Sequence, residues 1–283
     1  MAAAEPTADP PDVDEQIRYE VDGGIARLTI NAPEQGNALT PAMRDRLADR
    51  FFEISEDLRV RAVVLRGSGD RHFCTGAALG SAQRPSPPKP EGAPERGPGD
   101  VARLIRTGWQ RLVGSILDCE RPVICAVNGT AAGGGMQLAL ACDIVVMADT
   151  AKFIEVFVRR GIMPDAGGAY ILPRLVGLHR AKELLLLGED CSAVEADRIG
   201  LVNRVVPASE LDATADTFAA KFLTLPTRAV SLTKKLANRS LESSREQSFS
   251  DEADFQELIS ATADMAEGLD AFRERRSPEF KGW

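Results

Sequence analysis

Two uninterrupted apolar runs, separated by glycines and a helical pattern, constrain the fold of this chain more than any other feature. The runs are PVICAVNG (122–129) and DIVVMAD (143–149), both rich in β-branched residues and without polar alternation. Strands that are buried on both faces have this composition. Three consecutive glycines (133–135) and a helical pattern lie between them. The order strand, helix, strand predicts neighbouring parallel strands in a sheet covered on both faces.

Other segments add a hairpin, a further strand and several helices. IRYEV and IARLTIN alternate around Asp22-Gly23-Gly24 and predict a β-hairpin, and RAVVLRG (61–67) predicts a buried strand. Thr40 and Pro41 resemble an N-cap followed by proline at the first helical position. Apolar residues then recur at helical spacing at Met43, Leu47, Phe51, Ile54 and Leu58. More helices are expected at 100–117, 166–177, 179–187 and 192–199.

The chain divides into a tail, an α/β core and a helical C-terminal segment. Residues 1–16 are acidic, contain proline and predict a disordered tail. The core is expected to span 17–207, with a mobile surface insertion at 81–99, where six prolines and three glycines occur. Residues 208–283 are expected to be helical. One apolar stripe there suits a subunit interface, with the members Phe255, Leu258, Ile259, Thr262, Met265, Leu269 and Phe272.

Composition argues against several classes of function. An apolar content of 44% in 283 residues supports a sizeable core. The net charge of -8 and the lack of a Lys/Arg cluster argue against a nucleic-acid partner. No run reaches the roughly 18 apolar residues of a membrane span, and no signal-peptide pattern opens the chain, so we expect a cytoplasmic protein. With only His72 and His179 present, we expect neither a His-rich metal site nor a Ser-His-Asp triad.

Two glycine-bearing turns are candidates for a site. FCTGAAL (73–79) follows a buried strand and places a glycine before small residues, as the segment around 133–135 does. Two turns with accessible main-chain amides could converge on one oxygen atom. The spacing GTAAGGG differs from the dinucleotide-binding pattern and lies deep in the chain, which disfavours a Rossmann site. The glycines could also serve only a tight strand-to-helix turn.

Six motifs occur along the chain: GNALT (36–40), FCTGAAL (73–79), RPVICAVNGTAAGGGMQLALACDI (121–144), AKF (151–153), GIMPDAGGAYILPRLVG (161–177) and AFRERRSPEFKG (271–282). Together they resemble the enoyl-CoA hydratase/isomerase (crotonase) superfamily, and the resemblance extends from about Ile17 to Trp283. Several are similar to the subgroup that isomerises unsaturated acyl-CoA thioesters, including the ring-opening isomerases of phenylacetate breakdown.

This resemblance implies a crotonase-like spiral of ββα units with a C-terminal helical trimerisation segment. It implies an acyl-CoA thioester as ligand, no cofactor apart from the coenzyme A that enters with the substrate, and a homotrimer or a dimer of trimers. It also implies an oxyanion hole from the amides of Ala77 and Gly134. Such donors stabilise an enolate oxygen by about 3 to 4 kcal/mol each. The residues expected to bind substrate are Ala77, Ala78, Leu79, Gly80, Gly134 and Phe157.

The carboxylates favour one reaction of the family over another. Hydratases of the family use two glutamates, whose positions fall here on Gln137 and Phe157. Asp165 stands where the isomerases have an aspartate that shuttles a proton between C4 and C2, and apolar neighbours such as Ile162 and Met163 are expected to raise its pKa. An aspartate in PDAGG is also a good helix N-cap. We expect Glu155 to be solvated or salt-bridged.

The resemblance, together with the pattern of carboxylates, therefore implies an acyl-CoA-processing enzyme that moves a double bond through a thioester enolate, with Ala77, Gly134 and Asp165 as catalytic residues. Two alternatives remain open: an enoyl-CoA hydratase, and a protein that binds acyl-CoA without turnover. Gln137 and Phe157 are the residues that keep the second alternative open.

Overall fold

The larger of two sheets forms the centre of the molecule. The computed structural model describes residues 12–79, 89–95, 97 and 99–283. The predicted hairpin is confirmed and opens this sheet, and every later strand runs parallel to its neighbour. In spatial order the strands are β1 (Ile17–Asp22), β2 (Ile25–Ile30), β3 (Ala62–Gly67), β5 (Val123–Val127), β7 (Ile144–Ala148) and β10 (Arg204–Val206).

A second, smaller sheet lies beside the first. Its strands β4, β6 and β8 are parallel, and β9 is antiparallel to β8. Each of the first three directly follows a strand of the large sheet, and a helix comes next, so the chain winds through successive ββα units. In spatial order the strands are β4 (His72–Cys74), β6 (Thr130–Ala132), β8 (Lys152–Ile154) and β9 (Asp190–Ser192).

The first long helix is α2 (Pro41–Glu56), as predicted. The Oγ1 of Thr40 accepts a hydrogen bond from the Met43 N–H at 3.2 Å, which satisfies one of the unpaired donors at the helix start. The helical pattern over 100–117 is interrupted. It comprises α3 (Asp100–Ile105), the π-helical segment η2 (Arg106–Gln110) and α4 (Arg111–Leu117). A π-turn adds one residue to a helical turn, so η2 shifts the faces of α3 and α4 relative to each other.

The helices of the later ββα units are α5 (Gly134–Leu140), α6 (Gly168–Leu187) and α7 (Ala193–Arg198). Within α6, Gly177 has the non-helical φ of 74°, which divides the element where the sequence predicted two helices. Short 3₁₀ turns occur at η1 (Pro33–Gln35), η3 (Val158–Arg160) and η4 (Ala208–Glu210).

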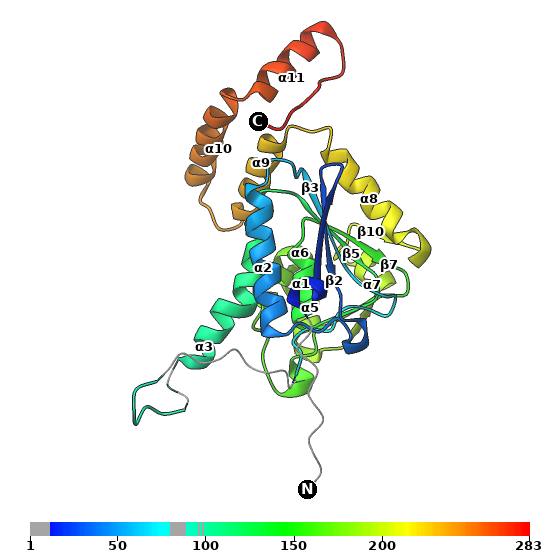
Figure 1. Ribbon diagram of the computed structural model, residues 1–283, viewed down its shortest axis with the longest axis vertical. Coiled ribbons are helices and arrows are strands. Elements are labelled where there is room, and N and C mark those ends of the chain that lie inside the picture. Colours follow the sequence, from blue (N-terminus) through cyan, green and yellow to red (C-terminus); the bar gives the residue numbers. More distant parts are fainter. Residues whose placement is uncertain (1–11, 80–88, 96, 98) are drawn as a thin grey trace.

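The chain after residue 207 is helical, as expected. Figure 1 shows α8 against the sheet, whereas α10 and α11 extend away from it. The amine of Lys234 on α9 pairs with Asp143 at 2.7 Å, which fixes α9 to the core. The helices are α8 (Leu211–Phe222), α9 (Thr227–Arg239), α10 (Arg245–Ser260) and α11 (Ala263–Glu274).

The expected disordered tail is wrong for its last residues. Val13–Gln16 form a short helix, α1, and the carboxylate of Asp14 pairs with Arg46 at 2.7 Å and Arg50 at 2.9 Å on α2. These two ion pairs hold the segment against α2, although it has little apolar surface to bury. Residues 1–11 and most of the expected insertion at 81–99 lie outside the described residues. No helix in the described ranges is both long and apolar enough to cross a membrane.

Candidate functional site

The turn after β4 presents the main-chain amide of Ala77. Gly76, with a φ of 93°, accepts a hydrogen bond at its carbonyl from the Leu39 N–H at 2.8 Å, and the Ala78 N–H donates to the Leu39 carbonyl at 3.0 Å. The Gly76 carbonyl and the Ala77 N–H belong to the same trans peptide group and point in opposite directions, so the N–H of Ala77 points away from Leu39. Within the described ranges, the Ala77 amide has no acceptor in the protein.

A second turn, between β6 and α5, presents the amide of Gly134. Gly133 has a φ of 52°, and its N–H donates to the Ile154 carbonyl at the end of β8, at 2.9 Å. Gly134 is the first residue of α5, where main-chain donors have no partner inside the helix. Among the residues that the structure describes, none accepts a hydrogen bond from its N–H.

The two turns pack against each other. The pairing of β4 with β6 brings their ends together. A Cβ at Gly76 would lie 3.4 Å from the Gly134 nitrogen, and a Cβ at Gly135 would lie 2.0 Å from the Cys74 carbonyl oxygen. Only glycine permits this approach at 135, because no side chain fits in that space. The two free amides therefore belong to adjoining turns.

Trp109, which the sequence analysis did not single out, lies over the second turn. A Cβ at Gly134 would meet its ring carbons Cη2 and Cζ3 at 2.7 Å. Trp109 belongs to η2, and π-turns are frequent at functional sites. Glycine is therefore needed at 134 because any larger side chain would collide with the indole ring. The continuous helical pattern over 100–117 did not indicate the π-helical turn that places Trp109 there.

Asp165 is partly buried in the loop before α6, and burial raises the pKa of its carboxyl. The alternative that it caps α6 is wrong, because the helix begins at Gly168 with Gly167 as N-cap and has no side-chain cap. Gln110 of η2 donates from Nε2 to the Asp165 carbonyl at 3.3 Å. The π-helical segment therefore contacts both Gly134 and the Asp165 loop. Ile162 and Met163, expected to enclose Asp165, are mostly exposed in the single chain.

Of the remaining residues expected to bind substrate, some lie at the two turns and one lies outside the described residues. Phe157 is 7% exposed, and its Cζ lies 3.6 Å from the position of a Cβ on Gly133, so its ring borders the second turn. Ala78 lies in the first turn, and Leu79 beside it is exposed. Gly80 lies outside the described residues. No group of three or more His, Cys, Asp or Glu in the described part of the chain is arranged to hold a metal ion.

Comparison with known proteins places this geometry in a family. The sequence matches the family described as Enoyl-CoA hydratase/isomerase over residues 20–283. The chain belongs to this family.

Its curated relatives include both hydratases and an isomerase. The chain is 36% identical over 269 residues to the 1,2-epoxyphenylacetyl-CoA isomerase of Escherichia coli K12, covering 95% of this chain and 99% of that protein. It is 37% identical over 266 residues to the crotonyl-CoA hydratase of Syntrophomonas wolfei, covering 94% and 98%. Family membership makes the chain an acyl-CoA-processing enzyme of the hydratase/isomerase type, without choosing between the two reactions.

Solved structures of the family share the fold. The crystal structure of an enoyl-CoA hydratase from Bacillus anthracis superposes with a TM-score of 0.84 at 32% identity, covering 95% of this chain and all of that one (100%). The predicted fold class is confirmed: this is the α/β crotonase fold, with two sheets and C-terminal helices.

A buried acid–amide pair lies next to the second turn of this enoyl-CoA hydratase/isomerase family member. Gln137 and Glu155 are each 1% exposed, and the Nε2 of Gln137 donates to the Oε1 of Glu155 at 2.6 Å. Burial raises the pKa of Glu155 to about 8. The expectation of a solvated or salt-bridged Glu155 is wrong. Its signal in the sequence was its position between the apolar residues Ile154 and Val156, directly after β8.

Proposed function

We propose that this protein shifts a double bond in an enoyl-CoA thioester through an enolate. The proposal depends on the free amides of Ala77 and Gly134, which belong to adjoining turns. Two fixed donors aimed at a thioester oxygen stabilise the charge that develops there when a neighbouring carbon loses a proton. Asp165 is the proposed acid/base.

In the proposed reaction, the proton that Asp165 removes from the substrate is the one that it later returns. In the direction from 3-enoyl to 2-enoyl, the carboxylate of Asp165 takes a proton from C2. The electron pair moves onto the carbonyl oxygen, which accepts hydrogen bonds from the N–H groups of Ala77 and Gly134. The enolate then collapses, C4 takes the proton back from Asp165, and the double bond lies between C2 and C3. The raised pKa of Asp165 suits a group that both accepts and returns a proton.

The surroundings of the amides support isomerisation over hydration. Hydration requires one group to activate water and another to deliver a proton, and the expected glutamate positions hold Gln137 and Phe157. The rings of Phe157 and Trp109 border the second turn, so an acyl chain there meets apolar walls. Ala78, Leu79 and Gly80 are proposed to line the substrate path from the first turn.

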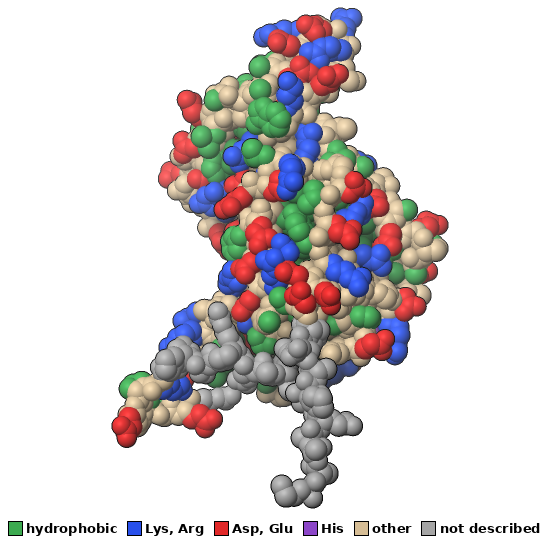
Figure 2. Space-filling model, viewed as in Figure 1, with side chains coloured by type: hydrophobic (Ala, Val, Ile, Leu, Met, Phe, Trp, Pro, Cys, Tyr) green, Lys and Arg blue, Asp and Glu red, His purple; other side chains and the backbone are tan. Residues whose placement is uncertain are grey.

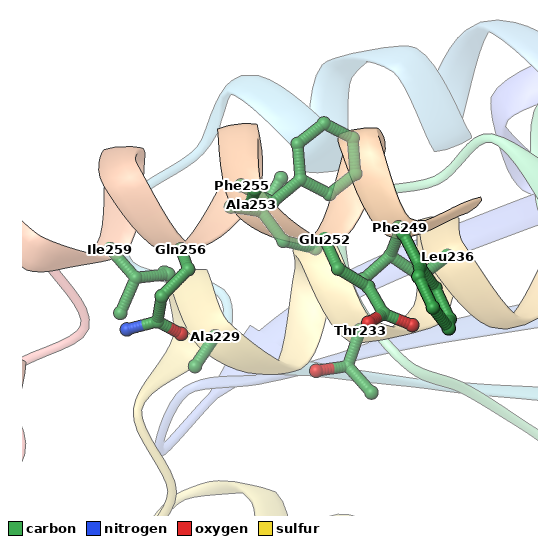
Figure 3. A pocket seen from close by; sticks show the side chains of 10 residues that line it. Ala229, Thr233, Leu236, Phe249, Glu252, Ala253, Phe255, Gln256 and Ile259 are labelled. Atoms are coloured by element: carbon green, nitrogen blue, oxygen red, sulfur yellow. The ribbon is translucent and has the colours of Figure 1, made fainter. Parts of the chain in front are cut away.

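A trimer, or a dimer of trimers, is the proposed assembly. Figure 2 shows hydrophobic side chains on the surface over α9 and α10, and Phe249, Leu258 and Phe272 are exposed in the single chain. A groove of about 660 Å³ lies between α9 and α10, lined from both helices (Figure 3). Exposed apolar surface of this kind is typical of a subunit interface.

Hydration is the second candidate, because the relatives include a crotonyl-CoA hydratase and because Glu155 supplies a second carboxyl near the turn. The test compares conversion of a 3-enoyl-CoA with water addition to crotonyl-CoA, in wild type, Asp165→Asn and the exposed control Asp197→Asn. We expect wild type and the control to isomerise and Asp165→Asn to lose that activity. Hydration that survives Asp165→Asn supports the hydratase. Calorimetric acyl-CoA binding without turnover on any thioester supports the non-catalytic alternative.

A further inference from the structure

Gln137 and Glu155 join three segments that build the proposed site. Gln137 is the fourth residue of α5, and Glu155 directly follows β8. A Cβ at Gly168, the first residue of α6, would lie 2.3 Å from the amide of Gln137. The pair is therefore enclosed by the helix after the glycine turn, the strand that supports the turn, and the start of the helix that follows Asp165.

One oxygen on each side chain lacks a donor. The Oε1 of Gln137 and the Oε2 of Glu155 are both buried, and in the described ranges neither has a hydrogen-bond partner. Buried polar atoms are almost always paired, and an ionised carboxylate has no hydrogen to offer. A proton on the Oε2 of Glu155 would supply a donor, and the Oε1 of Gln137 is a buried acceptor without one. In that state each side chain would offer the kind of group that the other lacks.

Among the described residues, the helices around the pair bring no cation to it. The sequence of α5, GGMQLAL, contains no titratable residue, and α6 meets the pair at Gly168. Asp165, in the loop before α6, adds no positive charge either.

On the strand side, too, no cation in the part of the chain that the structure describes pairs with Glu155. Lys152 and Arg159, which flank Glu155 in the sequence, both pair with Asp190 at the surface, at 2.6 and 3.0 Å. Glu189 next to Asp190 is exposed. Burial without an ion pair favours the neutral acid, which agrees with the raised pKa of Glu155.

We propose that Gln137 and Glu155 form an uncharged carboxylic acid–amide pair that positions the glycine turn and Phe157, and that loss of its proton stops catalysis. The proposal rests on the enolate reaction proposed above and makes both side chains positioning residues. Two contacts carry the effect. The Gly133 N–H is bound to Ile154, the neighbour of Glu155, and the ring of Phe157 borders Gly133.

Ionisation of Glu155 would act on the turn in two ways. A buried carboxylate needs a donor at Oε2 as well as at Oε1, and Gln137 supplies only the one at Oε1, so the segment 154–157 must move to admit water. A fixed anion behind the turn also opposes the enolate charge that the Gly134 amide is to stabilise, and this repulsion is strong where water is excluded. Both effects lower the rate without removing a group that touches the substrate.

The first test is the pH profile of 3-enoyl-CoA isomerisation in wild type, Glu155→Gln and the exposed control Glu189→Gln. Glutamine keeps a donor at the place of the proposed acid proton and cannot ionise. With a pKa of about 8, the wild-type kcat should fall about tenfold between pH 7 and pH 9, whereas Glu155→Gln should keep its rate over that range. The control should follow wild type. A Glu155→Gln profile that parallels wild type, or a folded Glu155→Gln that is inactive at pH 7, overturns the proposal.

The second test does not depend on activity. The infrared difference spectrum of wild type minus Glu155→Gln at a pH below 7 should contain the carbonyl band of a protonated carboxyl, and the band should disappear as the pH is raised through about 8. If the band is absent, the uncharged pair is refuted. If the band is present but wild type isomerises no thioester, the proposed function fails and the pair stands.

Discussion

Replacing Glu155 by glutamine should make the protein more stable at neutral pH. Glutamate has an ordinary pKa of 4.5, and burial raises that of Glu155 to about 8. Between these values the unfolded chain releases the proton and the folded chain retains it, so wild-type stability is lost as the pH rises. Below pH 4.5, Glu155 is protonated in both the folded and the unfolded chain, so it does not lower the stability. Each pH unit costs about 1.4 kcal/mol, which gives about 3 kcal/mol at pH 7 and about 5 kcal/mol above pH 8.

Urea denaturation of wild type and Glu155→Gln at intervals from pH 5 to pH 9 measures this cost. The free energy of unfolding of the variant minus that of wild type should grow from pH 5 to pH 8, because only wild type loses stability over this range. The difference should level off above about pH 8, because Glu155 is then ionised in both the folded and the unfolded chain. Glu189→Gln should give a difference that stays near zero. A Glu155→Gln difference that does not change with pH would refute the claim that Glu155 is folded as a neutral acid.

Two further substitutions test the packing of the site and its scaffold. Gly135→Ala places a Cβ 2.0 Å from the Cys74 carbonyl, so the turns must separate, and we expect a lower Tm and a kcat reduced at least tenfold; unchanged kinetics would contradict the close packing. Lys234→Met leaves the carboxylate of Asp143, which is paired at 2.7 Å in wild type and is 22% exposed, without its cation, and should cost about 1 to 3 kcal/mol in urea denaturation. The exposed control Lys182→Met should cost less than about 0.5 kcal/mol. Equal costs for the two lysine variants would show that the pair of Lys234 with Asp143 does not stabilise the fold.

The long buried elements were predictable because their local sequence and their tertiary environment agree. The apolar runs at 122–129 and 143–149 became the parallel neighbours β5 and β7. The capping oxygen of Thr40 and the spacing of Met43 and Leu47 specified α2, and Gly177 marked the division of α6. In each case a feature within a few residues is sufficient to specify the structure.

The details around the site were not predictable in the same way. Strands β4, β6, β8 and β9 have three residues each, too few to show a period, so only pairing in the folded chain defines them. The π-helical placement of Trp109 depends on packing against Gly134. Gln137 and Glu155 are 18 residues apart, and their pairing follows from the arrangement of α5 and β8. Glu155 was therefore expected at the surface, where most glutamates lie.

Hydrogen exchange at the substrate tests the central claim most directly. An acyl-CoA that carries a C2 proton is incubated in D₂O with wild type, Asp165→Asn or Asp197→Asn, and deuterium at C2 is measured by mass spectrometry. We predict incorporation by wild type and by Asp197→Asn, and a rate reduced at least 100-fold in Asp165→Asn, because the enolate forms only when Asp165 removes the proton. Incorporation by Asp165→Asn at the wild-type rate would contradict the account.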